Sequence, residues 1–155
     1  NMNRKYGLIS LIAGLVLVLG LGSVFVFSQG SSEVKGNGDI EEMSPQAMKE
    51  FMKEDGTGFI VYTFDEDNRD NYLYSVKKAM ENNNVEGKEL NSHHPSFDGS
   101  KDQIYYGVRQ QTDTLAVYKD GKMKKQINLD EYESSKLEAK LDHFIQMSKE
   151  TYFAN

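Results

Sequence analysis

The feature that most constrains the fold is an apolar run, Phe59 to Phe64, that breaks abruptly into polar sequence. Thr63 is its only polar member, so the run lacks the alternation of a strand with one wet face. Continuous apolar strands are typical of parallel or mixed sheets that are covered on both faces. The polar segment Asp65 to Asp70 follows at once, and a helical pattern begins at Asn71. A buried strand that ends in a loop and feeds a helix is where open α/β proteins place their binding sites.

Ahead of this domain lies a stretch, Gly7 to Phe27, that contains no charged residue. It has the length of the ~20 residues that a bilayer-spanning helix needs, and it is apolar on all sides. Arg4 and Lys5 precede it and acidic sequence follows it, which predicts a cytoplasmic N-terminus and an extracytoplasmic domain in the cell membrane. The alternative is a signal peptide cleaved near Gly30 to give a secreted protein, although secretory apolar regions are shorter. The expected segments are a cytoplasmic N-terminus at 1–6, a transmembrane signal anchor at 7–27, a flexible linker at 28–43 and a folded domain at 44–155.

Composition excludes several classes of function. The chain of 155 residues has no cysteine and a formal net charge of −6. Without cysteine there is no disulfide, no thiolate metal site and no thiol nucleophile. The acidic excess disfavours binding of nucleic acid or of anionic lipid through the protein surface. The length allows one ordinary domain besides the apolar segment.

The rest of the domain alternates helical and extended patterns. Ser44-Pro45 is a typical helix start, Asp120-Gly121 is a strong hairpin signal, and Ser135 to Glu138 matches a capping box. The expected elements, in chain order, are a helix from Ser44 to Gly56, a strand Phe59–Phe64, a helix Asn71–Asn82, a strand Val85–Leu90, a helix or turn Lys101–Val108, strands Thr114–Tyr118 and Met123–Ile127, and a last helix from Ser135. This order predicts an α/β sandwich with helices on both faces of the sheet.

Two stretches of the domain resemble thioredoxins. Tyr106 to Arg109, followed by Thr114 to Lys122, is similar to the family's segment around its third strand and hairpin. Phe59 to Phe64 with its loop and helix is similar to the strand that carries the family's redox motif. The resemblance implies a thioredoxin-like three-layer sandwich with a mixed sheet. With its N-terminal apolar segment the chain resembles, by architecture, membrane-anchored members of Gram-positive bacteria, including the bacteriocin transport accessory type.

The chain departs from the family at the residues that carry its activity. Asp65 to Asp70 occupies the place of the Cys-x-x-Cys motif, and Asp113 stands where the cis-proline is expected. Thiol–disulfide exchange needs a thiolate, so this chemistry is excluded. The resemblance leaves a redox-inactive domain, without a cofactor, that binds a peptide or partner protein in the cell envelope and supports secretion or assembly. The expected contact surface consists of Asp65, Glu66, Asp67, Asn68, Arg69, Asp70, Tyr106, Thr112, Asp113 and Thr114.

Two other functions remain open. A metal-dependent enzyme or cation-binding protein would use the loop carboxylates or the pair His93 and His94. An EF-hand loop that began at Asp65 would need glycine at its sixth position and glutamate at its twelfth, and it has neither. Neighbouring residues in an extended segment point in opposite directions, which weakens the histidine pair as a metal site. A structural subunit of a membrane complex would instead show a large exposed apolar patch.

Overall fold

The structure, a computed structural model, describes residues 34–98 and 106–154. The predicted transmembrane segment 7–27 lies outside the described residues. Within them, no helix is long and apolar enough to cross a membrane.

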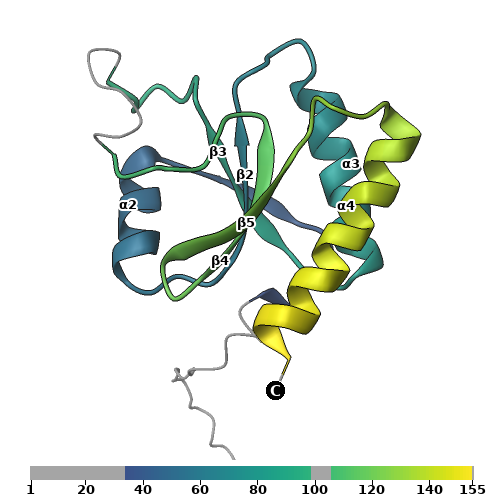
Figure 1. The fold of residues 1–155 in the computed structure, drawn as a ribbon. Coiled ribbons are helices and arrows are strands. Elements are labelled where there is room, and N and C mark those ends of the chain that lie inside the picture. The colour runs from purple at the N-terminus through teal and green to yellow at the C-terminus, as the bar shows by residue number, and fades with distance from the viewer. Residues whose placement is uncertain (1–33, 99–105, 155) are drawn as a thin grey trace, which may run out of the picture. The chain divides into compact units, whose positions relative to one another are not determined.

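The described residues form a mixed five-stranded sheet with helices on both faces (Figure 1). The strand order is β1-β3-β2-β4-β5. The strands are β1 (Ile40–Met43), β2 (Gly58–Thr63), β3 (Gly87–Asn91), β4 (Thr114–Lys119) and β5 (Lys122–Asn128). β1 and β3 run parallel to β2, whereas β4 is antiparallel to β2 and β5 is antiparallel to β4.

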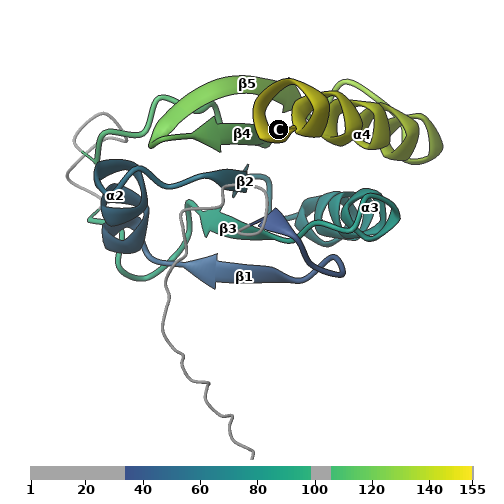
Figure 2. The ribbon, with the colours of Figure 1, turned by 90° about the horizontal axis from the view of Figure 1, so that it is seen from below.

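The helices complete a three-layer sandwich. Helix α2 (Pro45–Lys53) covers one face of the sheet, while α3 (Arg69–Asn82) and α4 (Ser134–Ser148) cover the other (Figure 2). Helix α4 continues into a π-helical turn, η2 (Lys149–Phe153). This arrangement confirms the predicted α/β sandwich with a mixed sheet and helices on both faces.

The central strand β2 is buried along its whole length, as the apolar run predicts. Phe59 and Val61 pack in the core cluster beneath α3 and α4, and Ile60 and Tyr62 pack in the cluster beneath α2. Fully burying a side chain of this size contributes about 1.5–3 kcal/mol, so the strand anchors both halves of the core. Phe64 differs from the prediction, because β2 ends at Thr63 and the Phe64 side chain is exposed.

Three other elements differ from the sequence prediction. Residues 40–43, which the predicted linker included, form β1; the exposed Glu41 and Glu42 conceal the strand in the sequence. Strand β3 begins at Gly87 rather than Val85, and Val85 forms an isolated bridge with Lys35. The predicted capping box is wrong, because α4 begins at Ser134 without a side-chain cap bond.

The β4–β5 hairpin confirms the Asp120-Gly121 signal. Both residues have positive φ, 54° and 80° respectively, which is what the favoured two-residue turn requires. A Cβ at Gly121 would lie 2.1 Å from the carbonyl oxygen of Met52, so only glycine fits there. The turn therefore fixes both the register of β5 and its approach to α2.

Candidate functional site

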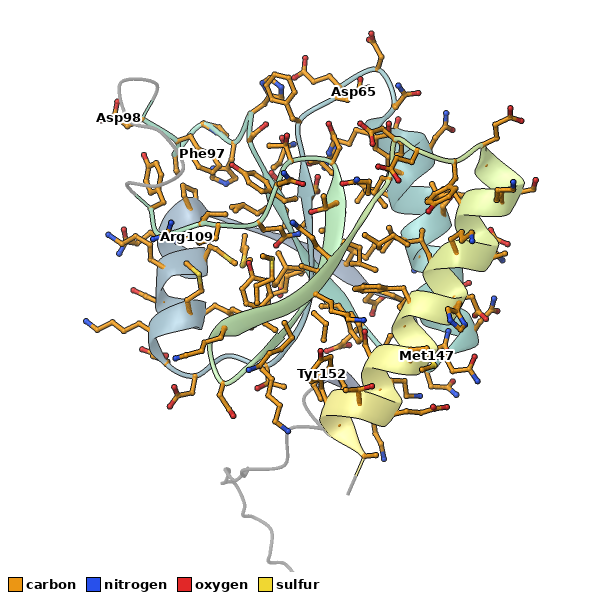
Figure 3. All side chains as sticks on the ribbon, in the orientation of Figure 1. Asp65, Phe97, Asp98, Arg109, Met147 and Tyr152 are labelled. Carbon is orange, nitrogen blue, oxygen red and sulfur yellow. The ribbon has the colours of Figure 1, made fainter. Side chains whose placement is uncertain are left out.

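The loop after β2, which carries Asp65 in Figure 3, lies where the parallel strands end. Asp113 holds this loop in place through hydrogen bonds. One carboxylate oxygen of Asp113 accepts hydrogen bonds from the backbone N–H groups of Phe64, at 2.9 Å, and of Asp65, at 3.1 Å. The backbone N–H of Asp113 donates to the Tyr62 carbonyl at 2.6 Å, and its own carbonyl accepts from Leu129 N–H at 2.9 Å. All backbone hydrogen-bonding groups of Asp113 are therefore used inside the domain.

Asp113 also has a backbone conformation that proline cannot adopt. Its φ is 57°, in the left-handed region, whereas the proline ring fixes φ near −65°. Aspartate and asparagine are among the side chains that tolerate this region. The chain at Asp113 therefore has a shape that a proline at this position would not allow. Because both of its backbone groups are bonded inside the domain, Asp113 cannot also pair with the backbone of a bound peptide.

Asp65 organises the acidic loop itself. Its carboxylate accepts from Asp67 N–H at 3.1 Å, from Asn68 N–H at 3.3 Å and from the Asn68 side-chain amide at 2.8 Å. The side-chain hydrogen bond from Asn68 is the largest cause that lowers the pKa of Asp65. Asn68 is the N-cap residue of α3 but gives it no side-chain cap bond. Asp65 therefore closes the turn that leads into the helix, while Glu66, Asp67 and Asp70 are exposed.

Beneath the loop, Arg69 forms a bidentate ion pair with a buried carboxylate that the sequence did not reveal. Its Nε and Nη2 donate to the two oxygens of Glu89 at 2.8 and 2.7 Å. The hydroxyl of Thr63 donates to the same carboxylate, and Glu89 is only 2% exposed. The hydrogen bond to Glu89 is the main cause that raises the pKa of Arg69. Arg69 is thus bound from within, although its other ionic neighbour, Glu42 at 3.6 Å, lies at the surface.

Phe64 is the exposed apolar residue of this region. Its ring is 56% exposed and stacks on the His93 imidazole, with 5.1 Å between the ring centres. The Phe64 carbonyl lies 2.8 Å from Nε2 of His93, and the His93 Nδ1 lies 3.7 Å from the Glu66 carboxylate. Contacts from Asp113 and His93 therefore fix the backbone of Phe64 while its ring faces solvent.

Two residues of the expected contact surface are buried instead. Tyr106 is 7% exposed, and its ring packs edge-on against Phe97 at 5.1 Å. Its hydroxyl oxygen accepts from the N–H of Asp98 at 2.8 Å, in the region that Figure 3 labels. Thr114 is fully buried and donates to the Gln111 carbonyl at 2.7 Å. Both side chains are therefore buried, and their hydroxyl groups are bonded within the domain.

The side-chain amide of Gln110, near this region, is buried, which the sequence does not predict. Gln110 is fully buried and donates to the Ile60 carbonyl at 2.9 Å and to the Thr114 hydroxyl at 3.0 Å. Its amide oxygen accepts from the Tyr118 hydroxyl at 3.0 Å, and burial raises the pKa of Tyr118. Glutamine in a polar segment predicts exposure, so no pattern in the sequence could have indicated this network.

The remaining predicted site residues, Thr112, His93 and His94, lie in different parts of the structure. Thr112 is half-buried and lines a shallow hollow with Gln111, Asn128, Asp130 and Glu131. His93 contacts Phe64, whereas His94 accepts through Nδ1 from the backbone N–H of Ser96 at 3.0 Å. Among the described residues, no group of three or more histidine, aspartate or glutamate side chains is placed to hold a metal ion. The two histidines therefore do not share a site.

Comparison with known proteins adds little to this geometry. No protein-family model matches the chain, and no curated protein matches it. Among solved structures, thioredoxin f2 of Chlamydomonas reinhardtii is similar at 12% identity and a TM-score of 0.46, over 75% of this chain and 99% of that one.

Proposed function

We propose that this protein is a redox-inactive, membrane-tethered thioredoxin-fold domain that binds a cationic segment of a peptide or partner protein in the cell envelope. The contact surface is the Phe64 ring together with the exposed carboxylates of Glu66 and Asp67. The segment 7–27 tethers it, with the domain outside the cytoplasmic membrane, where it supports secretion or assembly. The observation that carries the binding role is the exposed Phe64 ring on a backbone fixed from two sides.

Preorganisation gives this surface its binding potential. A large apolar side chain that is already held in place loses little conformational freedom when a partner covers it. Aromatic residues near the centre of an interface contribute much of the binding energy. Phe64 meets the first condition, because Asp113 holds its N–H and the His93 ring supports one of its faces.

The negative charge around Phe64 favours a positively charged partner segment. Glu66 and Asp67 are exposed beside Phe64, and Asp70 follows at the start of α3. Complementary charge increases the rate of encounter and selects among partners more than it adds affinity. A partner segment that combines lysine or arginine with an apolar or aromatic residue fits this combination. Recognition runs through side chains, because the backbone of Asp113 is already paired.

The test is binding of short synthetic peptides of graded positive charge and aromatic content to the full-length chain in non-ionic detergent. Covering a phenylalanine side chain contributes about 1.5–3 kcal/mol, so Phe64→Ala is expected to weaken binding about tenfold to a hundredfold. Tyr74→Ala is the matched control, since this aromatic on α3 is 62% exposed and lies outside the contact surface. Preference for neutral peptides, or equal losses in both variants, would contradict the proposal.

A further inference from the structure

The sheet has two edges whose outer sides carry no strand among the described residues. The edge strands are β1 and β5, at opposite ends of the order β1-β3-β2-β4-β5. An edge strand presents unpaired backbone groups that can pair with another chain. What each edge can accept therefore depends on the side chains around it.

The edge at β1 is acidic. A groove of about 630 Å³ lies between β1 and α3, and Ile40, Leu73 and the exposed ring of Tyr74 supply its apolar part. Its acidic lining consists of Asp39, Glu41, Glu42, Asp70 and Glu89. The two cations of the lining are engaged within the domain, Arg69 with Glu89 and Lys77 with Asp39 and Glu81. The groove therefore carries a net negative charge.

The edge at β5 is basic. A groove of about 300 Å³ lies between β5 and α4, beside Met147 and Tyr152 in Figure 3, and no carboxylate lines it. Its basic lining consists of Lys125, Lys140 and His143 around Ile127, Phe144 and Met147. Lys122 and Lys124 extend the basic strip along the strand. None of the ion pairs among the described residues involves a β5 lysine.

Strand direction and side-chain faces match between the edges. β5 is antiparallel to β4 and β4 to β2, so β5 runs in the same direction as β2, β3 and β1. Lys125 lies opposite Val117, and Glu42 lies beside Glu89, which is paired with Val61. Val117 and Val61 both face α3 and α4, so Lys125 and Glu42 point to the same face of the sheet. A second copy shifted across the sheet without rotation would place these two side chains together.

We propose that copies of this chain associate head to tail, with the β5–α4 edge of one against the β1–α3 edge of the next. Like edges are kept apart, because lysines would meet lysines and glutamates would meet glutamates. Edge lysines alone are a common protection against sheet aggregation. Here they match the acidic edge of a second copy in charge, in strand direction and in the face to which Lys125 and Glu42 point. Such a heterologous contact does not close on itself and gives open chains of copies. This inference does not depend on the Phe64 surface.

The test is sedimentation of the full-length chain in density-matched non-ionic detergent at low and high salt. At low salt the wild type is expected to form species larger than dimers that grow with concentration, and screening at ~1 M salt should disperse them. Glu41→Lys/Glu42→Lys and Lys122→Glu/Lys125→Glu should each weaken association at least about tenfold. A mixture of the two variants should regain it, because every contact between them again joins opposite charges.

Two controls separate edge contacts from other causes. Glu50→Lys/Glu54→Lys and Lys53→Glu/Arg109→Glu reverse exposed charges on and beside α2, which lines neither groove, and they match the changes in net charge. These variants should assemble like the wild type, and every variant keeps segment 7–27, so association through that segment would persist in all of them. A wild type that stays monomeric at low salt overturns the proposal. So does a variant mixture that fails to reassemble although each variant keeps the wild-type circular dichroism.

Discussion

Removing the Arg69 guanidinium should destabilise the domain far more than an exposed ion pair would suggest. Arg69→Met leaves the Glu89 carboxylate with the Thr63 hydroxyl as its remaining hydrogen-bond partner, and Glu89 is 2% exposed. Breaking a buried pair by removing one partner costs about 3–5 kcal/mol, because the other charge stays buried. The Arg69 side chain is 30% exposed, so water can enter in its place. We therefore expect the lower end of that range, about 3 kcal/mol.

The assay is urea unfolding of the full-length chain in non-ionic detergent, followed by tyrosine fluorescence, since the chain has nine tyrosines and no tryptophan. With a slope of about 1.5 kcal/mol per molar urea, the midpoint should fall by about 2 M. Lys78→Met on the same helix is the control. Its ion pair with Glu81 spans 3.7 Å between side chains that are 44% and 38% exposed, and such pairs contribute about 1 kcal/mol or less.

A double variant decides whether the cost comes from the stranded charge. Replacing both partners, as Arg69→Met/Glu89→Leu, removes the buried carboxylate together with its cation, and such exchanges are often neutral or stabilising. The double variant should therefore recover most of the loss. If it is as unstable as Arg69→Met, or if Arg69→Met costs under about 1 kcal/mol, the argument from burial fails.

Three further predictions concern other hydrogen bonds of the domain, and a fourth concerns metal binding. Asp113→Asn keeps an acceptor and the left-handed backbone and should cost under about 1 kcal/mol in urea unfolding, whereas Asp113→Pro should cost at least about 3 kcal/mol because φ is 57° and the N–H is bonded. In an NMR titration the pKa of Asp65 should lie below the usual value of an aspartate, and Asn68→Ala should raise it. The ionised Asp65 carboxylate stabilises the fold fully above the pKa of the unfolded state, and this stabilisation is lost as the pH falls through the pKa of the folded state. Tyr118→Phe removes the hydrogen bond that the hydroxyl donates to the Gln110 amide oxygen and should cost about 0.5–1.5 kcal/mol in urea unfolding. The native Tyr118 should ionise at higher pH than a free phenol in an alkaline absorbance titration, because burial raises its pKa. Addition of Ca²⁺ or Zn²⁺ should leave the melting temperature unchanged, and a rise of several degrees would revive the cation-binding alternative.

The sequence was informative where a residue's pattern and its surroundings agree. The apolar run predicts the central strand, and Asp120-Gly121 predicts the closing hairpin, because both signals are local. Strand β1 was not predicted, because its two exposed glutamates are typical of a linker. Its position depends on pairing with β3, which lies far along the chain. Glu89 escaped for a related reason, since only the fold brings Arg69 beneath the loop and makes a buried carboxylate tolerable.

The acidic residues near the loop therefore have different roles, and their number alone does not indicate a binding surface. Asp65 closes a turn and Asp113 holds that turn on β4, so both carboxylates are already bonded to backbone N–H groups. A carboxylate that already accepts hydrogen bonds inside the domain interacts only weakly with a binding partner. Glu66 and Asp67 are exposed and make no contact that the turn requires. Neutralising Asp65 should therefore disturb the loop, whereas neutralising Glu66 and Asp67 should change binding and leave stability within about 0.5 kcal/mol.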